Sequence, residues 1–261
     1  MKREIKSVLG RLAYATGLYR RHFRGKAVIV LFHRVDDRYA GNPISCTVGE
    51  FRAYCDFFRR YFIVVPLAEL LAKLERGDDV SRHLVITFDD GYKDNHDVAA
   101  VELERRGLPA TFFIATNFIG STRTPWWDAD AGITPTWMTW DDVRALHAAG
   151  FEIGAHTINH VDLGVVAGDE AMREIAGSGE RLRHELGAPV PFFTYPYGRP
   201  HQITEENRLA VREAGYQCCL SAFGGTVRPG VDPFRIRRIP ISPWFISPYQ
   251  FGIEAMLEEP E

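Results

Sequence analysis

The chain has 261 residues, of which 46% are hydrophobic and 25% charged, a composition typical of one large globular α/β domain. Its formal charge of -3 at pH 7 excludes a general affinity for nucleic acid, because phosphate binding depends on a surplus of Lys and Arg. No apolar run approaches the roughly 20 residues that span a bilayer, and no secretory signal is evident. We therefore expect a cytoplasmic protein.

Residues 1–26 combine a basic character with an apolar periodicity. Eight Lys and Arg residues occur in this segment. Six residues, most of them apolar or aromatic, recur at helical spacing, namely Ile5, Val8, Leu9, Leu12, Thr16 and Tyr19. The pattern predicts a basic amphipathic helix that precedes the main domain. Such a helix either makes peripheral contact with an anionic surface, here the inner face of the membrane, or packs on the domain.

Between residues 27 and 243, short apolar runs alternate with helical stretches, as in a mostly parallel sheet buried beneath helices. The predicted strands are 27–32, 62–65, 84–88, 110–115, 151–154, 192–195, 216–220 and 236–241. The predicted helices are 48–61, 67–76, 94–106, 141–149, 169–186 and 205–214. Seven or eight such units predict a single β/α barrel with its active site at the carboxyl ends of the strands. Residues 244–261 are expected to form a C-terminal tail.

The four cysteines, Cys46, Cys55, Cys218 and Cys219, are too few and too irregularly spaced for a disulfide scaffold or a zinc site. We expect buried thiols.

Two acidic residues, Asp89 and Asp90, follow the predicted strand 84–88. Successive side chains at a strand end point in different directions, so the two carboxylates can have different roles. The alternative is that they cap the helix that follows.

Two histidines, His156 and His160, follow the predicted strand 151–154 and are four residues apart. They can converge on one metal if the segment turns helically, although an isolated pair of this kind is more often structural. A β/α barrel brings both motifs to the same rim. Two imidazoles and one carboxylate with an open position form a catalytic zinc set, and the remaining carboxylate can then act as general base.

A third motif, Tyr195-Pro196-Tyr197-Gly198, follows the strand 192–195. Pro and Gly fix a turn, and a backbone amide such as that of Tyr197 can point toward a developing oxyanion. Alone, the motif predicts only a turn.

These three motifs, in this order, resemble the polysaccharide deacetylase family, also called carbohydrate esterase family four, over nearly everything after Lys26. The resemblance implies a single deformed (β/α) barrel of about seven strands. It also implies a site with Asp89 as catalytic base, the Tyr197 amide at the oxyanion, and a divalent metal on Asp90, His156 and His160. Zinc is the default for this ligand set, with Co²⁺, Ni²⁺ or Mn²⁺ as alternatives.

The chain departs from the family pattern at two places. Thr194 stands where an Arg usually orients the base, and Arg238, from a later strand, can supply that charge or can be a surface residue. The late motif that carries the general acid is absent. His33, which ends the first strand, is the candidate acid, because the arrangement resembles the permuted poly-N-acetylglucosamine deacetylase branch.

Aromatic residues between the fourth strand and the next helix are candidate sugar contacts, because aromatic faces stack on sugar rings. The candidate substrate-binding residues are Trp126, Trp127, Tyr195 and Pro196. We predict a hydrolase of linear amides that removes N-acetyl groups from an N-acetylglucosamine-type polysaccharide or its precursor. The alternatives are an O-acetyl esterase or deformylase on a lipid-linked sugar, and an inactive sugar-binding barrel.

Overall fold

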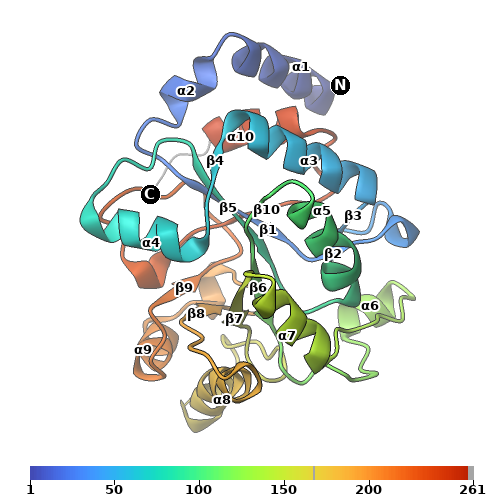
Figure 1. The fold of residues 1–261 in the computed structure, drawn as a ribbon, viewed down its shortest axis with the longest axis vertical. Coiled ribbons are helices and arrows are strands. Elements are labelled where there is room, and N and C mark those ends of the chain that lie inside the picture. Colours follow the sequence, from blue (N-terminus) through green and yellow to red (C-terminus); the bar gives the residue numbers. More distant parts are fainter. Residues whose placement is uncertain (167, 258–261) are drawn as a thin grey trace.

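The computed structural model describes residues 1–166 and 168–257, and its centre is one sheet of parallel strands surrounded by helices (Figure 1). The strands follow one another in the order β10-β1-β5-β6-β7-β8-β9. Their bounds are Val28–Phe32 (β1), His83–Phe88 (β5), Thr111–Ile114 (β6), Glu152–Ala155 (β7), Phe192–Thr194 (β8), Cys218–Leu220 (β9) and Ile239–Pro240 (β10). Six of the predicted strands agree closely with these bounds, the predicted strand 62–65 corresponds to the short strand β4, Ile63–Val64, and the predicted strand 236–241 is shortened to β10.

The chain between Ile236 and Ile241 joins the two ends of this sheet. Ile236 forms a parallel bridge with Leu220 of β9, and β10 pairs with β1. A short strand, β4 (Ile63–Val64), pairs with the first residues of β5, whereas β6 pairs with its last residues. The sheet is therefore a deformed (β/α) barrel, as predicted.

Helices cover the outside of the barrel. Their bounds are Val48–Tyr61 (α3), Leu67–Arg76 (α4), Val101–Glu104 (α5), Trp126–Asp130 (α6), Trp140–Ala148 (α7), Gly168–Leu186 (α8), Glu205–Glu213 (α9) and Pro248–Leu257 (α10). Short 3-10 turns occur at Asp37–Tyr39, Pro200–Gln202 and Pro233–Arg235, and β2 (Arg34–Val35) pairs with β3 (Ser45–Cys46). A capping box of Thr47 and Glu50 begins α3.

The predicted helix 94–106 differs from the structure in its first half, where Asn95–Ala100 is a π-helix. Buried Asn95 donates from Nδ2 to the carbonyl oxygen of His33 at 2.6 Å, and Asp94 accepts from the Val35 amide at 2.7 Å. These two bonds tie the start of the helix to the loop after β1. Hydrogen bonds to another segment were not visible in the periodicity of the sequence.

Alternating side chains on the strands point to different cores. Val30 and Ile86 pack beneath the helices, whereas Ile29 and Val85 share a second cluster with three leucines of α4. The carboxylate of Glu152, at the start of β7, accepts hydrogen bonds from the first two amides of α4. Helix α4 therefore closes the amino end of the barrel and leaves the carboxyl ends of the strands for the site. All four cysteines are free and buried, as expected.

The N-terminal segment is two helices, α1 (Lys2–Ala15) and α2 (Leu18–His22), separated by Gly17 with φ +79°. Both lie at one end of the molecule, where α1 packs along α10 (Figure 1). Because the chain turns at Gly17, Tyr19 faces inward and is buried, so it does not continue the apolar stripe of α1. Helix α10 lies within the predicted tail, whose last residues, 258–261, are outside the described part of the chain. No described helix is both long and apolar enough to cross a membrane.

Candidate active site

Strand β5 delivers Asp89 and Asp90 to its carboxyl end, and both side chains are buried. The Asp89 amide still donates to the Phe32 carbonyl of β1, so Asp89 continues the sheet. Asp90 leaves it with φ +77° and is followed by Gly91 with φ +97°. This change of backbone direction separates the two carboxylates, as the alternation of strand side chains predicted.

The loop after β7 delivers His156 and His160. It is not the helical turn that the sequence suggested, because Thr157 and His160 have positive φ values of 62° and 55°. Left-handed backbone at a residue other than glycine is unfavourable by roughly 1–3 kcal/mol and persists only when surrounding contacts impose it. Glu174 of α8 imposes it here. Its carboxylate accepts from the Ile158 and Asn159 amides at 2.9 and 2.8 Å.

Asp90, His156 and His160 converge on one point. Oδ1 of Asp90 lies 3.3 Å from Nε2 of His156 and 3.2 Å from Nε2 of His160, and the three groups form a compact potential ligand set. Burial acts to raise the pKa of Asp90, but the two imidazoles hold it well below its usual range.

The hydrogen bonds around His156 test whether this set suits a cation. Nδ1 of His156 lies 2.6 Å from the Thr194 hydroxyl oxygen and 3.0 Å from the Thr194 carbonyl oxygen; because the carbonyl can only accept, the tautomer with the proton on Nδ1 is the one that satisfies both contacts. In the neutral ring, Nε2 then presents a lone pair toward Oδ1 of Asp90, which has no hydrogen-bond partner among the described residues. Two facing acceptors in a buried place fit a divalent metal between them.

Packing rather than hydrogen bonding orients the second imidazole. The ring of His160 lies among Phe118, Trp127 and Tyr197, with ring centroids 6.0, 4.7 and 4.9 Å away. Its Nδ1 makes no hydrogen bond within the described chain. The aromatic residues therefore hold His160 with Nε2 toward Asp90.

Arg238 pairs with Asp89 from the segment that closes the barrel. Its guanidinium donates to both carboxylate oxygens, at 2.8 and 2.7 Å, and the Arg238 side chain is fully buried. Burial acts to raise the pKa of Asp89, but the charge of Arg238 holds it below its usual value. The structure thus places Arg238, and not Thr194, against this carboxylate, while Thr194 holds His156.

A cavity of about 740 Å³ opens above these residues, and its lining includes His33, Asp89, Asp90, His156, His160 and Tyr197. Tyr197 has φ +60°, and its amide donates to no other group in residues 1–166 and 168–257. Asp90, Thr157, His160 and Tyr197 account for four of the five described non-glycine residues with positive φ. Such clustering is characteristic of functional sites.

Some of the predicted sugar contacts line this cavity, and others are buried. Trp126 and Trp127 of α6 line it, and Trp126 donates from Nε1 to the Tyr197 hydroxyl at 3.1 Å. Tyr195 also belongs to the lining but is only 1% exposed, and its hydroxyl accepts from Cys219. Pro196 is buried and is not part of the lining.

Sequence analysis missed the residues that hold α6 in place. Arg34 of β2 pairs with Asp128 at 2.6 Å, and both side chains are almost fully buried. The Tyr92 hydroxyl donates to Asp128 at 3.0 Å and accepts from Trp127 at 2.9 Å. It also missed the rim formed by Asp162, Arg199 and His201, because these polar loop residues carry no periodic signal.

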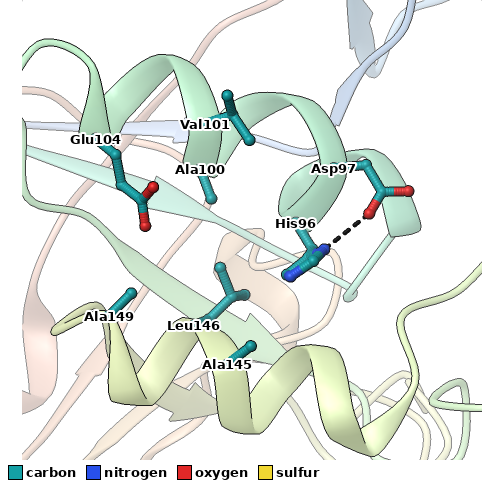
Figure 2. Close-up of a pocket in the computed structure, with 8 residues that line it drawn as sticks. All are labelled: His96, Asp97, Ala100, Val101, Glu104, Ala145, Leu146 and Ala149. Atoms are coloured by element: carbon teal, nitrogen blue, oxygen red, sulfur yellow. Dashed lines mark hydrogen bonds and ion pairs between the residues drawn. The ribbon is translucent and has the colours of Figure 1, made fainter.

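A second hollow, of about 390 Å³, lies between α7 and the helix that includes α5 (Figure 2). His96 and Asp97 line it, and with Asp142 they form the other group in the described chain that is compact enough for a metal. The ammonium of Lys93 lies 2.8 Å from Asp142 and 3.3 Å from Asp97, so both carboxylates already have a cationic partner. Ion pairs within the protein therefore account for this partly exposed group without a metal.

Comparison with known proteins assigns the family. The sequence profile of the polysaccharide deacetylases matches residues 76–219, which is more than half of the chain. The protein belongs to the polysaccharide deacetylase family, a group of hydrolases of the carbohydrate esterase family four type.

Individual relatives agree with this assignment. The chain is 25% identical over 235 residues to YxkH of Bacillus subtilis (strain 168), whose name places it among the polysaccharide deacetylases; the match covers 88% of this chain and 77% of that protein. It is 24% identical over 208 residues to the poly-beta-1,6-N-acetyl-D-glucosamine N-deacetylase of Staphylococcus epidermidis, covering 76% of this chain and 68% of that protein. IcaB from Ammonifex degensii has the same fold, with a TM-score of 0.75, 21% identity and coverage of 89% of this chain and 97% of that one.

Proposed function

We propose that this protein hydrolyses the N-acetyl group of glucosamine-type residues in a polysaccharide or its precursor. The observation that carries the proposal is the juxtaposition of two differently held carboxylates. Asp90 faces two imidazole nitrogens, and Asp89 is held by Arg238 beside them, with 4.0 Å between Oδ2 of Asp89 and Nε2 of His156. A protein that only binds sugar has no need for an ionised base next to a metal site.

Asp90, His156 and His160 would hold a divalent cation, with Zn²⁺ as the first candidate and Co²⁺, Ni²⁺ or Mn²⁺ as alternatives. Such a cation supplies Lewis acidity, which polarises an acyl oxygen and lowers the pKa of a water toward about 7.

Asp89 accepts the proton of the attacking water. Arg238 favours the ionised form of Asp89 and fixes the plane of its carboxylate, so the base needs no rearrangement before the reaction. The free amide of Tyr197 donates to the oxyanion that develops on the acetyl group.

His33 protonates the departing amine. It follows β1, which pairs with β5 along its length, and its side chain lines the cavity with Asp89 and Asp90. Burial lowers the pKa of His33, against the opposing effect of Asp90 and Asp89, and this makes its protonated form a stronger acid toward the amine.

The substrate class follows from the wall of the cavity and from one relative. Trp126 is 61% exposed above the site and offers an aromatic face to a sugar ring. The relative from Staphylococcus epidermidis bears the name of a poly-β-1,6-N-acetylglucosamine N-deacetylase. We therefore take a β-linked N-acetylglucosamine oligomer as the first substrate to examine.

The test measures acetate release from N-acetylglucosamine oligomers, and from O-acetylated and lipid-linked sugars, by the zinc-loaded protein. Asp89→Asn is expected to lower kcat by about 10²–10⁴ while metal content remains near one equivalent. Asp90→Ala should remove both metal and activity, and Asp97→Asn, in the second hollow, should change neither. His33→Ala is expected to slow the reaction with the metal retained.

Turnover of O-acetyl sugars alone would replace the proposal with an esterase. Sugar binding without any turnover would replace it with a binding protein. Near-normal activity of Asp89→Asn would remove Asp89 from the role of base.

A further inference from the structure

Helix α1 presents its apolar stripe to the outside of the molecule. Ile5, Val8, Leu9 and Leu12 are 52%, 57%, 50% and 57% exposed, although they occupy adjacent positions on one helical face. A helix that only packs on its own domain turns such a stripe inward. Here the domain contacts a different face.

Close contacts fix this orientation. A Cβ on Gly10 would lie 2.0 Å from the Tyr249 carbonyl oxygen of α10, so the two helices meet at the backbone there. The Ser7 and Ser247 hydroxyls lie 2.6 Å apart, and buried Tyr14 packs against Tyr19, Phe57 and Tyr61. Rotation of α1 to bury its leucines would break all of these contacts.

The same segment carries concentrated positive charge. Residues 1–26 contain eight Lys and Arg against one acidic residue, Glu4, whereas the whole chain has a net charge of -3. Six of these basic side chains are exposed, namely Lys2, Arg3, Arg11, Arg20, Arg21 and Arg24. A two-fold dimer through this face would bring like charges together, which disfavours a second copy as the partner.

We propose that α1 and α2 form a peripheral docking surface for an anionic lipid bilayer. Helix α1 lies parallel to the membrane, with Val8 and Leu12 inserted among the lipid chains. The surrounding basic side chains contact the anionic headgroups. Two further exposed apolar side chains extend this docking surface. They are Leu18 of α2 and Trp244, whose ring lies against Arg3. The proposal is independent of the reaction that the barrel catalyses.

Co-sedimentation with vesicles tests this proposal. The full chain is incubated with vesicles of equal parts phosphatidylglycerol and phosphatidylcholine, or of phosphatidylcholine alone. The wild-type protein is expected to partition onto the anionic vesicles at least about tenfold more strongly, and this preference should shrink in 0.5 M salt. The double variant Val8→Ser with Leu12→Ser keeps the charge and should bind at least about tenfold more weakly.

Leu209→Ser on α9 is the matched control, because Leu209 is 50% exposed but lies on a different helix. It should bind vesicles as the wild type does. All three proteins should retain the same Tm and the same acetate release from a soluble oligomer, which separates this test from that of the proposed function. Equal binding to neutral and anionic vesicles, or equal loss in the control, would overturn the proposal. So would a stable dimer that the double variant abolishes.

Discussion

The guanidinium of Arg238 lies against both carboxylate oxygens of Asp89, the residue that we propose as the base. It is 149 residues from Asp89 in sequence, and it reaches that carboxylate because β10 lies beside β1, which pairs with β5. The sequence could only offer Arg238 as one of two interpretations, since a basic residue next to a strand is common on surfaces. The closure of the barrel brings the two groups together.

We expect Arg238→Met to lower kcat by at least about 100-fold and to destabilise the fold by about 3–5 kcal/mol. The reason is that Asp89 would remain as an unpaired buried charge. Metal content should stay near that of the wild type, because the substitution touches none of Asp90, His156 and His160. Kinetics, urea unfolding and metal analysis measure the three effects.

Arg235→Met is the control for this substitution, because the Arg235 side chain is 58% exposed and pairs with the surface acids Glu205 and Asp232. It should change kcat and stability very little. A loss of metal in Arg238→Met comparable to that in Asp90→Ala would show that Arg238 supports the ligand set instead of the base.

At the scale of elements, the strands were predictable and several of their connections were not. Buried parallel strands are continuous apolar runs, so seven of eight strands could be placed from hydrophobicity alone. The π-helix at Asn95–Ala100 depends on hydrogen bonds to the loop after β1, and the outward face of α1 depends on its backbone contact with α10. Such long-range contacts leave no local pattern.

The histidine loop is the clearest case in which one element is shaped by another. Two carboxylate oxygens of Glu174 receive three hydrogen bonds from Ile158 and Asn159, and this anchors a loop with two left-handed residues to α8. The sequence placed His156 and His160 at one site but suggested a helical turn to do so. In the observed loop, the two imidazoles still converge on Asp90, but the backbone is strained, and the hydrogen bonds to Glu174 of α8 offset this strain.

We expect Glu174→Ala to weaken metal binding by about 10- to 100-fold, because residues that orient metal ligands affect affinity in that range. The two amides that lose their acceptor are also expected to destabilise the fold by about 1–3 kcal/mol. Competition with a chelator measures the first effect and thermal unfolding the second. Glu170→Ala, an exposed position on the same helix, should leave both unchanged, and equal affinities for the two variants would show that the loop holds its shape without α8.

For the molecule as a whole, the barrel could be predicted because many short apolar runs alternate with helical stretches along the chain. The two motifs of the proposed site could be interpreted only together with the fold, since a parallel barrel gathers residues that follow strands at one rim. Trp126 and Trp127 in the wall of the cavity could be predicted, but the contacts that hold this wall in place could not. The Arg34–Asp128 pair and the Tyr92–Trp127 hydrogen bond join residues that are far apart in sequence and have no shared motif.

The free energy of unfolding should depend on pH in a way that reflects one unusual acid, Asp94. Burial raises its pKa to about 6, against the hydrogen bond from the Val35 amide. Its unfolded value is near 3.9. Between these values the folded protein binds more protons at this residue than the unfolded chain does. Stability from Asp94 therefore decreases as the pH rises from about 4 to about 6, and the penalty is fully present above that range.

Asp94→Asn removes this titration and keeps an oxygen that accepts from the Val35 amide. We expect the variant to exceed the wild type in unfolding free energy by about 1–3 kcal/mol at pH 8 and by little at about pH 3.5. Urea unfolding of both proteins across this range measures the difference. Asp78→Asn, at a partly exposed position beside Arg76, should follow the wild type at every pH. A constant difference between Asp94→Asn and the wild type would show that the carboxyl does not titrate in this window, and that its hydrogen bonds, not its charge, set its contribution to the fold.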